Sequence, residues 1–131
     1  MNKLVVIDDD PINHFLMQHI LRGDKHFDRT TYTLNGDLVL DYIEENKEST
    51  EKLPDVIFLD LNMPQFSGWD FLDRFKGLYN SVKKDIKIFI MTSSIIPSDR
   101  TRTEQYPFVK SFISKPLKQN SIREINEEAF A

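Results

Sequence analysis

The sequence predicts an α/β domain in which helices cover both faces of a parallel sheet. Short apolar segments alternate along the chain with longer segments whose apolar residues recur at helical spacing. The apolar segments are continuous rather than alternating, which is typical of strands that are buried on both faces. With 131 residues and no cysteine, the chain can form one domain with an ordinary core and no disulfide.

Five strands are expected. Four of them are short runs rich in Val, Ile and Phe, at residues 4–7, 56–59, 86–91 and 109–113. The remaining strand, at residues 28–34, contains Thr and Tyr and is of mixed polarity, which favours a place at the edge of the sheet.

The first helix is expected directly after the first strand. Asp10 is a suitable N-cap, Pro11 a suitable first helical residue, and Gly23 a suitable end. Apolar positions with helical spacing predict the face that packs inward, at Ile12, Phe15, Leu16, His19 and Ile20. His19 is therefore expected to be partly buried, and His14 and His26 to lie at the surface.

The other helices are predicted with similar signals. Asn35-Gly36 is typical of a hairpin, but a helix at residues 37–46 is favoured because Leu38, Tyr42 and Ile43 then share a face. Ser67 and Asp70 resemble a capping box ahead of an apolar stripe at Phe71, Leu72, Phe75 and Leu78. A short helix is expected between Pro97 and Pro107, and a closing helix at residues 122–130.

Composition excludes several classes of partner. The formal net charge is −4, from 21 acidic and 17 basic residues, and this mild acidity argues against nucleic acid as the main partner. No apolar run approaches the roughly 20 residues that span a bilayer. The first strand runs directly into three acids, unlike a signal peptide. A cytoplasmic protein without membrane contact is expected.

Polar residues that are suited to phosphate and metal chemistry follow four of the predicted strands. Asp8 and Asp9 follow the first strand, Asp60 the second apolar run, Thr92 the third and Lys115 the fourth. Ligands of open α/β sheets bind at the carboxyl ends of the strands. Three carboxylates and one ammonium group leave two negative charges uncompensated, and oxygen ligands without His or Cys suit Mg²⁺ or Mn²⁺.

These residues, in this order, resemble the receiver domain of bacterial two-component response regulators. The segment from Asp55 through Asp60 to Pro64 and Gly68 looks like that family's phosphorylation site, and Lys115-Pro116 matches its last motif. The resemblance covers essentially the whole chain. It implies a flavodoxin-like, five-stranded parallel sheet of order 2-1-3-4-5 with helices on both faces, and a single receiver domain over residues 1–131 with no output domain.

The resemblance also implies a role for each of the polar residues that follow these strands. Asp60 would accept a phosphoryl group from a phosphohistidine. Mg²⁺ would be bound by Asp9, Asp60 and the backbone carbonyl of Asn62, with Asp8 acting through water. Thr92 and Lys115 would contact phosphoryl oxygens.

Two further features follow from the resemblance. The Lys115–Pro116 peptide bond is expected to be cis. Phe112 stands where the family often has an aromatic switch residue that acts with Thr92, and as a phenylalanine it lacks a hydroxyl. Asn62 and Ser94 are expected to tune the lifetime of the phosphoryl group.

The implied partners are a sensor histidine kinase or a histidine phosphotransfer protein, and a downstream protein target. A monomer or a weak, phosphorylation-dependent dimer is expected, with catalysis limited to the protein's own phosphorylation and dephosphorylation. The chain could be a switch, a relay intermediate or a domain cut from a longer protein. Two other classes remain. A Mg²⁺-dependent phosphatase would need a proton donor where Asn62 stands, and a binding module would keep the fold without the phosphorylation.

Overall fold

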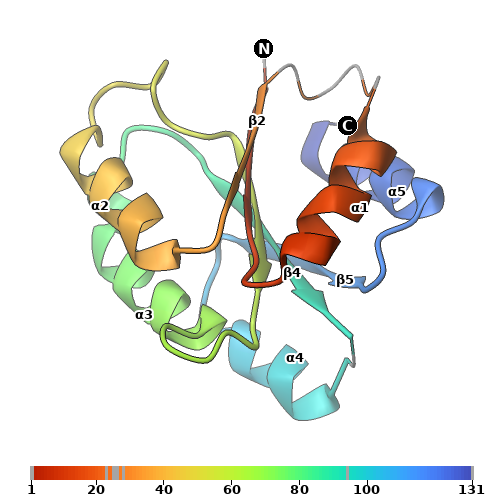
Figure 1. Ribbon diagram of the computed structural model, residues 1–131. Helices are drawn as coiled ribbons and strands as arrows, with labels where there is room; N and C mark the ends of the chain where they lie inside the picture. The colour runs from red at the N-terminus through yellow and green to blue at the C-terminus, as the bar shows by residue number, and fades with distance from the viewer. Residues whose placement is uncertain (1, 23, 25–26, 28, 94, 131) are drawn as a thin grey trace.

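The computed structural model of the protein describes residues 2–22, 24, 27, 29–93 and 95–130. It has a central five-stranded parallel sheet of order β2-β1-β3-β4-β5. In Figure 1, α2 and α3 lie on one side of the sheet and α1 and α5 on the other. The predicted fold and strand order are therefore confirmed.

The strands lie where the apolar runs predicted them, with ends that differ by a residue. They are β1 (Lys3–Ile7), β2 (Arg29–Thr33), β3 (Val56–Asp60), β4 (Lys87–Thr92) and β5 (Val109–Ser114). All five residues of β3 are buried, because it is the central strand and helices cover both of its faces. The mixed-polarity strand β2 lies at the sheet edge, as predicted.

The helices are α1 (Pro11–Leu21), α2 (Gly36–Glu45), α3 (Gly68–Leu78), α4 (Pro97–Thr103) and α5 (Gln119–Phe130), with a 3₁₀ turn η1 (Tyr79–Ser81) after α3. The residues Asn35-Gly36 open a helix and not a hairpin, in agreement with the preferred reading. The capping box of Ser67 and Asp70 is present. Asp10 caps α1 through its side chain, whereas the proposed end at Gly23 lies outside the described residues.

The side chains of β3 divide between two cores, one on each side of the sheet. Ile57 and Leu59 join a cluster with Phe71 and Phe75 of α3. Val56 and Phe58 join a second cluster that α1 and α5 complete, with Met17, Ile122 and Ile125 among its members. This alternation places a helix layer on each face.

Among the described residues, no helix has the length and apolar composition that crossing a bilayer requires.

The predicted inward face of α1 is wrong at four of its five positions, and Ile20 alone is half-buried against the core. Ile12 and Phe15 are 70% and 67% exposed, and Leu16 and His19 are exposed as well. The helix instead buries Asn13, Met17 and Leu21, which lie four residues apart. The physical reason is a polar contact, because Asn13 donates to the buried Asp8 and so fixes the rotation of the helix.

Two smaller expectations also change. Leu38 and Tyr42 are 57% and 46% exposed, while Leu40 and Ile43 form the buried side of α2. His14 is half-buried rather than at the surface, with its ring beside that of Tyr32. His26 lies outside the described residues.

Candidate functional site

The polar residues predicted to act together lie at one edge of the sheet. Asp8 directly follows β1, Asp60 ends β3, Thr92 ends β4 and Lys115 directly follows β5. Because these strands are parallel, their carboxyl ends lie at the same edge. Asp8, Asp60 and Thr92 are 0%, 4% and 3% exposed, whereas Asp9 is exposed. Three polar side chains are therefore buried beside solvent-accessible Asp9, where a ligand can enter.

Lys115 joins the two buried carboxylates. Its Nζ lies 3.0 Å from Oδ2 of Asp8 and 3.1 Å from Oδ2 of Asp60. Burial acts to lower the pKa of Lys115, but its hydrogen bonds and charge interactions with the two carboxylates outweigh burial and raise that pKa. The ammonium group therefore stays charged and compensates one of the three negative charges.

Asp8 is held by several donors. Its Oδ1 accepts the backbone N–H of Asp10 at 2.9 Å, and its Oδ2 accepts the side-chain amide of Asn13. Burial acts to raise the pKa of Asp8, but the Asp10 N–H, Lys115 and Asn13 together lower it. Asp8 is therefore a stable anion despite its burial.

Asp60 is in a different electrostatic state. Burial raises the pKa of Asp60, and the negative charge of Asp8 raises it further. The backbone N–H of Asn62, 3.0 Å from Oδ1, and the charge of Lys115 lower this pKa, but they offset the rise only in part. Two nearby carboxylates with pKa values shifted in opposite directions mark a site that is adapted for chemistry. Asp60 is therefore the carboxylate whose ionised form would be stabilised most by a neighbouring cation or electrophile.

The acidic cluster fits a hard divalent cation. Asp8, Asp9 and Asp60 each offer a carboxylate oxygen, and these oxygens lie within 4.8 Å of one another. Mg²⁺ prefers oxygen ligands and commonly takes one or two carboxylates. The donors present are carboxylates, and Lys115 leaves two of their three charges uncompensated. The chemistry of this donor set therefore suits Mg²⁺.

A glycine allows the loop after Asp60 to fold back against the strand end. A Cβ atom on Gly68 would lie 2.7 Å from the carbonyl oxygen of Asp60 and from Cα of Leu61. The N–H of Gly68 donates to the carbonyl of Leu61 at 3.0 Å. The start of α3 therefore packs directly on the backbone that carries Asp60.

The fourth and fifth strands complete the pocket. The backbone N–H of Lys115 donates to the carbonyl of Thr92 at 2.9 Å, which ties the two strand ends together. The Lys115–Pro116 peptide bond is cis, as expected. Phe112 is half-buried against the core beside α3, with the Arg100 guanidinium 5.1 Å from its ring centroid.

Sequence reasoning did not identify Asn13 as part of this site. A polar residue among the apolar positions of α1, five residues after Asp8, was the available signal. Trp69, near the start of α3, packs against the core with the Arg102 guanidinium 4.0 Å from its ring centroid. Ser94 lies outside the described residues.

Comparison with known proteins agrees with this arrangement. The family model of the response regulator receiver domain matches residues 4–127. The chain is 26% identical to the chemotaxis protein CheY of Listeria monocytogenes over 129 residues, which cover 98% of each chain. It is 27% identical over 119 residues to a protein-glutamate methylesterase/protein-glutamine glutaminase of Treponema pallidum, which cover 90% of this chain but only 27% of that protein.

Solved structures show the same fold. A two-component response regulator from Cytophaga hutchinsonii superimposes with a TM-score of 0.85 at 26% identity, covering 98% of this chain and 96% of that one. The receiver domain of the histidine kinase CKI1 from Arabidopsis thaliana, complexed with Mg²⁺, superimposes with a TM-score of 0.75 at 25% identity, covering 95% of this chain and 91% of that one.

Proposed function

The chain belongs to the response regulator receiver domain family, whose members are phosphoacceptors of two-component signalling, and we propose that Asp60 is its phosphoacceptor. The observation that supports this most directly is the position of Asp60. It is a buried carboxylate at a strand end, with Lys115 on one oxygen and the Asn62 N–H on the other. Asp8 and Asp9 lie beside it.

The proposed reaction is a transfer from a phosphohistidine. A carboxylate oxygen of Asp60 forms a bond with phosphorus as the bond between phosphorus and the donor's imidazole nitrogen breaks. Lys115 and the Asn62 N–H orient the carboxylate and offset the growing negative charge. Thr92 and Lys115 then hydrogen-bond phosphoryl oxygens. Positioning and charge compensation supply most of the catalysis in phosphoryl transfer.

Mg²⁺ would be held by Asp9, Asp60 and the backbone carbonyl of Asn62, with Asp8 acting through water. Mn²⁺ prefers the same oxygen donors. When bound, the ion supplies positive charge at the phosphoryl oxygens. Asp8 serves chiefly to keep Lys115 charged and in place, because its lowered pKa leaves it ionised beside the ammonium group.

The donor would be a sensor histidine kinase or a histidine phosphotransfer protein in the cytoplasm, and the output a downstream protein target. Catalysis would be limited to the chain's own phosphorylation and dephosphorylation, in a monomer or a weak, phosphorylation-dependent dimer. Asn62 stands where a related phosphatase would carry a general acid, which supports this choice over turnover of free phosphate esters.

Signal output would pass from Thr92 to Phe112. Attraction of the Thr92 hydroxyl to the phosphoryl group opens space behind it, and Phe112 on β5 is the large side chain that would fill this space. Phe112 is already half-buried and has no hydroxyl to desolvate. The expected response is therefore a modest population shift at α4, β5 and the start of α5, since a full reversal needs about 5.5 kcal/mol.

Phosphorylation can be tested by intact-mass measurement after incubation with acetyl phosphate and Mg²⁺. The wild-type protein should gain about one phosphate mass, and Asp60→Asn should abolish the gain. Asp85→Asn, at an exposed acid paired only loosely with Lys87 at 3.8 Å, is the matched control and should label normally. Labelling that survives in Asp60→Asn, or steady turnover of p-nitrophenyl phosphate, would contradict the proposal.

A further inference from the structure

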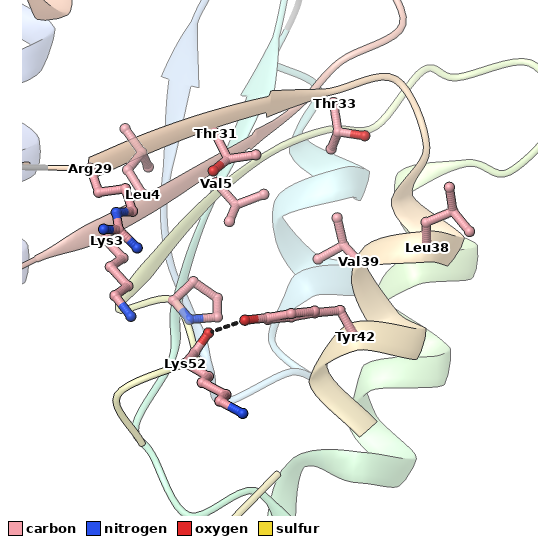
Figure 2. Close-up of a pocket in the computed structure, with 11 residues that line it drawn as sticks. Lys3, Leu4, Val5, Arg29, Thr31, Thr33, Leu38, Val39, Tyr42 and Lys52 are labelled. Atoms are coloured by element: carbon pink, nitrogen blue, oxygen red, sulfur yellow. Dashed lines mark hydrogen bonds between the residues drawn. The ribbon is translucent and has the colours of Figure 1, made fainter. Parts of the chain in front are cut away.

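A pocket of about 390 Å³ lies at the β2 edge of the sheet, beside the outer side of α2. Figure 2 shows its walls, which come from β1, β2, α2 and the segment before β3. Ligand pockets for small molecules have volumes of about 300–1,000 Å³, so this one is of suitable size. None of its lining residues belongs to the acid cluster around Asp60.

The interior of the pocket is apolar and built in advance of any ligand. Its apolar lining residues include Val5, Leu38, Val39, Tyr42 and Pro54. The Tyr42 ring reaches across the pocket in Figure 2, and its hydroxyl donates to the carbonyl of Lys52 at 2.9 Å. Leu38 and Tyr42 remain about half exposed. Covering this surface with the apolar part of a ligand would remove it from water, which favours binding.

One end of the pocket is cationic. Figure 2 places the side chains of Lys3 and Arg29 together at that end. Among the described residues, neither side chain has a carboxylate within ion-pair distance. Asp55, whose side chain accepts the backbone N–H of Lys3 at 2.7 Å, already pairs with Lys84 at 3.1 Å. Two cations without an ion-pair partner among the described residues, in a chain of net charge −4, indicate a local preference for an anion.

We propose that this pocket binds a small organic anion whose aromatic or aliphatic body lies between Val5, Val39 and Tyr42 and whose acidic group meets Lys3 and Arg29. The apolar interior provides affinity and the two cations provide orientation, a division that is common in small-molecule sites. The site acts independently of Asp60, so its occupant need not carry or receive a phosphoryl group.

The test uses 2-naphthoate and its neutral analogue 2-naphthamide in NMR titrations of the ¹⁵N-labelled protein. Naphthoate should cause saturable chemical-shift changes at the backbone amides of Val5, Thr31, Val39 and Tyr42. Naphthamide should bind about tenfold more weakly, because it lacks the negative charge. Lys3→Gln and Arg29→Gln should each weaken naphthoate binding about threefold, the size of an exposed ion pair, and leave naphthamide unaffected. Lys110→Gln, at an exposed lysine on β5, is the matched control and should bind both probes as the wild type does.

A filling variant provides a second, independent readout. Thr31→Trp should abolish binding of both probes while phosphorylation by acetyl phosphate and the circular dichroism spectrum stay unchanged. Asp60→Asn should bind naphthoate as the wild type does, which separates this proposal from the phosphoacceptor role.

Three results would overturn the proposal. They are equal affinity for the acid and the amide, shifts confined to the exposed residues of α1, and no saturable shift at all. Response to an acidic extended peptide along the outer edge of β2, without response to naphthoate, would overturn it in favour of a protein partner that adds a strand.

Discussion

Helices α1 and α3 each follow a strand that ends at or beside an acid of the cluster around Asp60, yet their apolar residues lie on opposite sides: buried in α3 and largely exposed in α1. In α3 the predicted stripe faces the core, with Phe71, Leu72 and Phe75 fully buried. In α1 most of the predicted stripe faces solvent, and the buried side is formed by Asn13, Met17 and Leu21. Apolar spacing alone therefore predicted the buried side of α3 correctly and that of α1 incorrectly.

The difference arises from what fixes each helix at its first turn. The start of α3 is held by the capping box and by the close approach of Gly68 to Asp60, and its apolar stripe then has no competitor for the inward side. The start of α1 is held by Asn13, whose amide donates to the buried, ionised Asp8. Loss of that donor would leave a buried acceptor less satisfied, at a cost of about 1–3 kcal/mol, and Met17 and Leu21 on the same side of α1 pack into the core.

The largest effect expected from this comparison is at Phe75 of α3. Phe75→Ala should destabilise the protein by about 3–5 kcal/mol, because it leaves a cavity in a close-packed core. Its ring is 4.7 Å from that of Phe108, edge to face, and 6.2 Å from that of Phe71. Urea unfolding followed by circular dichroism measures the change. A loss under about 1 kcal/mol would mean that the apolar stripe of α3 does not pack in the core.

At Gly68, the structure predicts an effect on both the fold and the site. Gly68→Ala should cost up to about 3 kcal/mol, since the added methyl group would meet the backbone of Asp60 and Leu61. The displacement should also slow labelling of Asp60 by acetyl phosphate. Gly77→Ala is the matched control, because a Cβ atom there meets nothing within 4 Å, and it should be neutral or slightly stabilising. Equal behaviour of the two variants would contradict the close approach.

Asn13 tests the polar anchor of α1. Asn13→Ala should destabilise the protein by about 1–2 kcal/mol at pH 7, because Asp8 loses a donor. The folded pKa of Asp8 is lowered from its ordinary value of 3.8, so the stability that its donors contribute is present above that value and is lost as pH falls through the folded pKa. The difference between variant and wild type should therefore shrink below about pH 4.

The control for Asn13 is Gln18→Ala on the exposed side of the same helix, which should change stability little at any pH. Unfolding curves at pH 3.5 and pH 7 compare the variants. A cost for Asn13→Ala that grows as the pH is lowered would contradict the assigned contact with an ionised Asp8.

The sequence predicted most of the fold because its signals are local or paired with a known motif. Continuous apolar runs predicted the strands, and strand-end residues such as Asp60 and Lys115 predicted which side chains would meet. It did not predict the rotation of α1, because the contact between Asn13 and Asp8 competes with the apolar pattern and depends on where the strand end lies. The pocket at the β2 edge was also not predicted, since Lys3, Arg29 and Tyr42 belong to three segments with no shared motif.

The smallest expected effect is at Phe15, and it separates the two readings of α1 most directly. If the stripe predicted from spacing were the core face, Phe15→Ser would remove a buried ring at a cost of about 3–5 kcal/mol. In the structure Phe15 is 67% exposed, so the change should fall within about 0.5 kcal/mol. Met17 of the same helix is 0% exposed, so Met17→Ser should instead destabilise the protein by about 2–5 kcal/mol.

Phe15→Ser should also label normally with acetyl phosphate, because the Phe15 side chain is largely exposed and lies outside the core. Ile12, Phe15 and Leu16 are all exposed side chains of α1, so the core does not depend on any of them. Urea unfolding of the Phe15 and Met17 variants side by side makes the comparison. A loss at Phe15 that equals the loss at Met17 would show that α1 is rotated toward its apolar stripe and that Asn13 does not set its orientation.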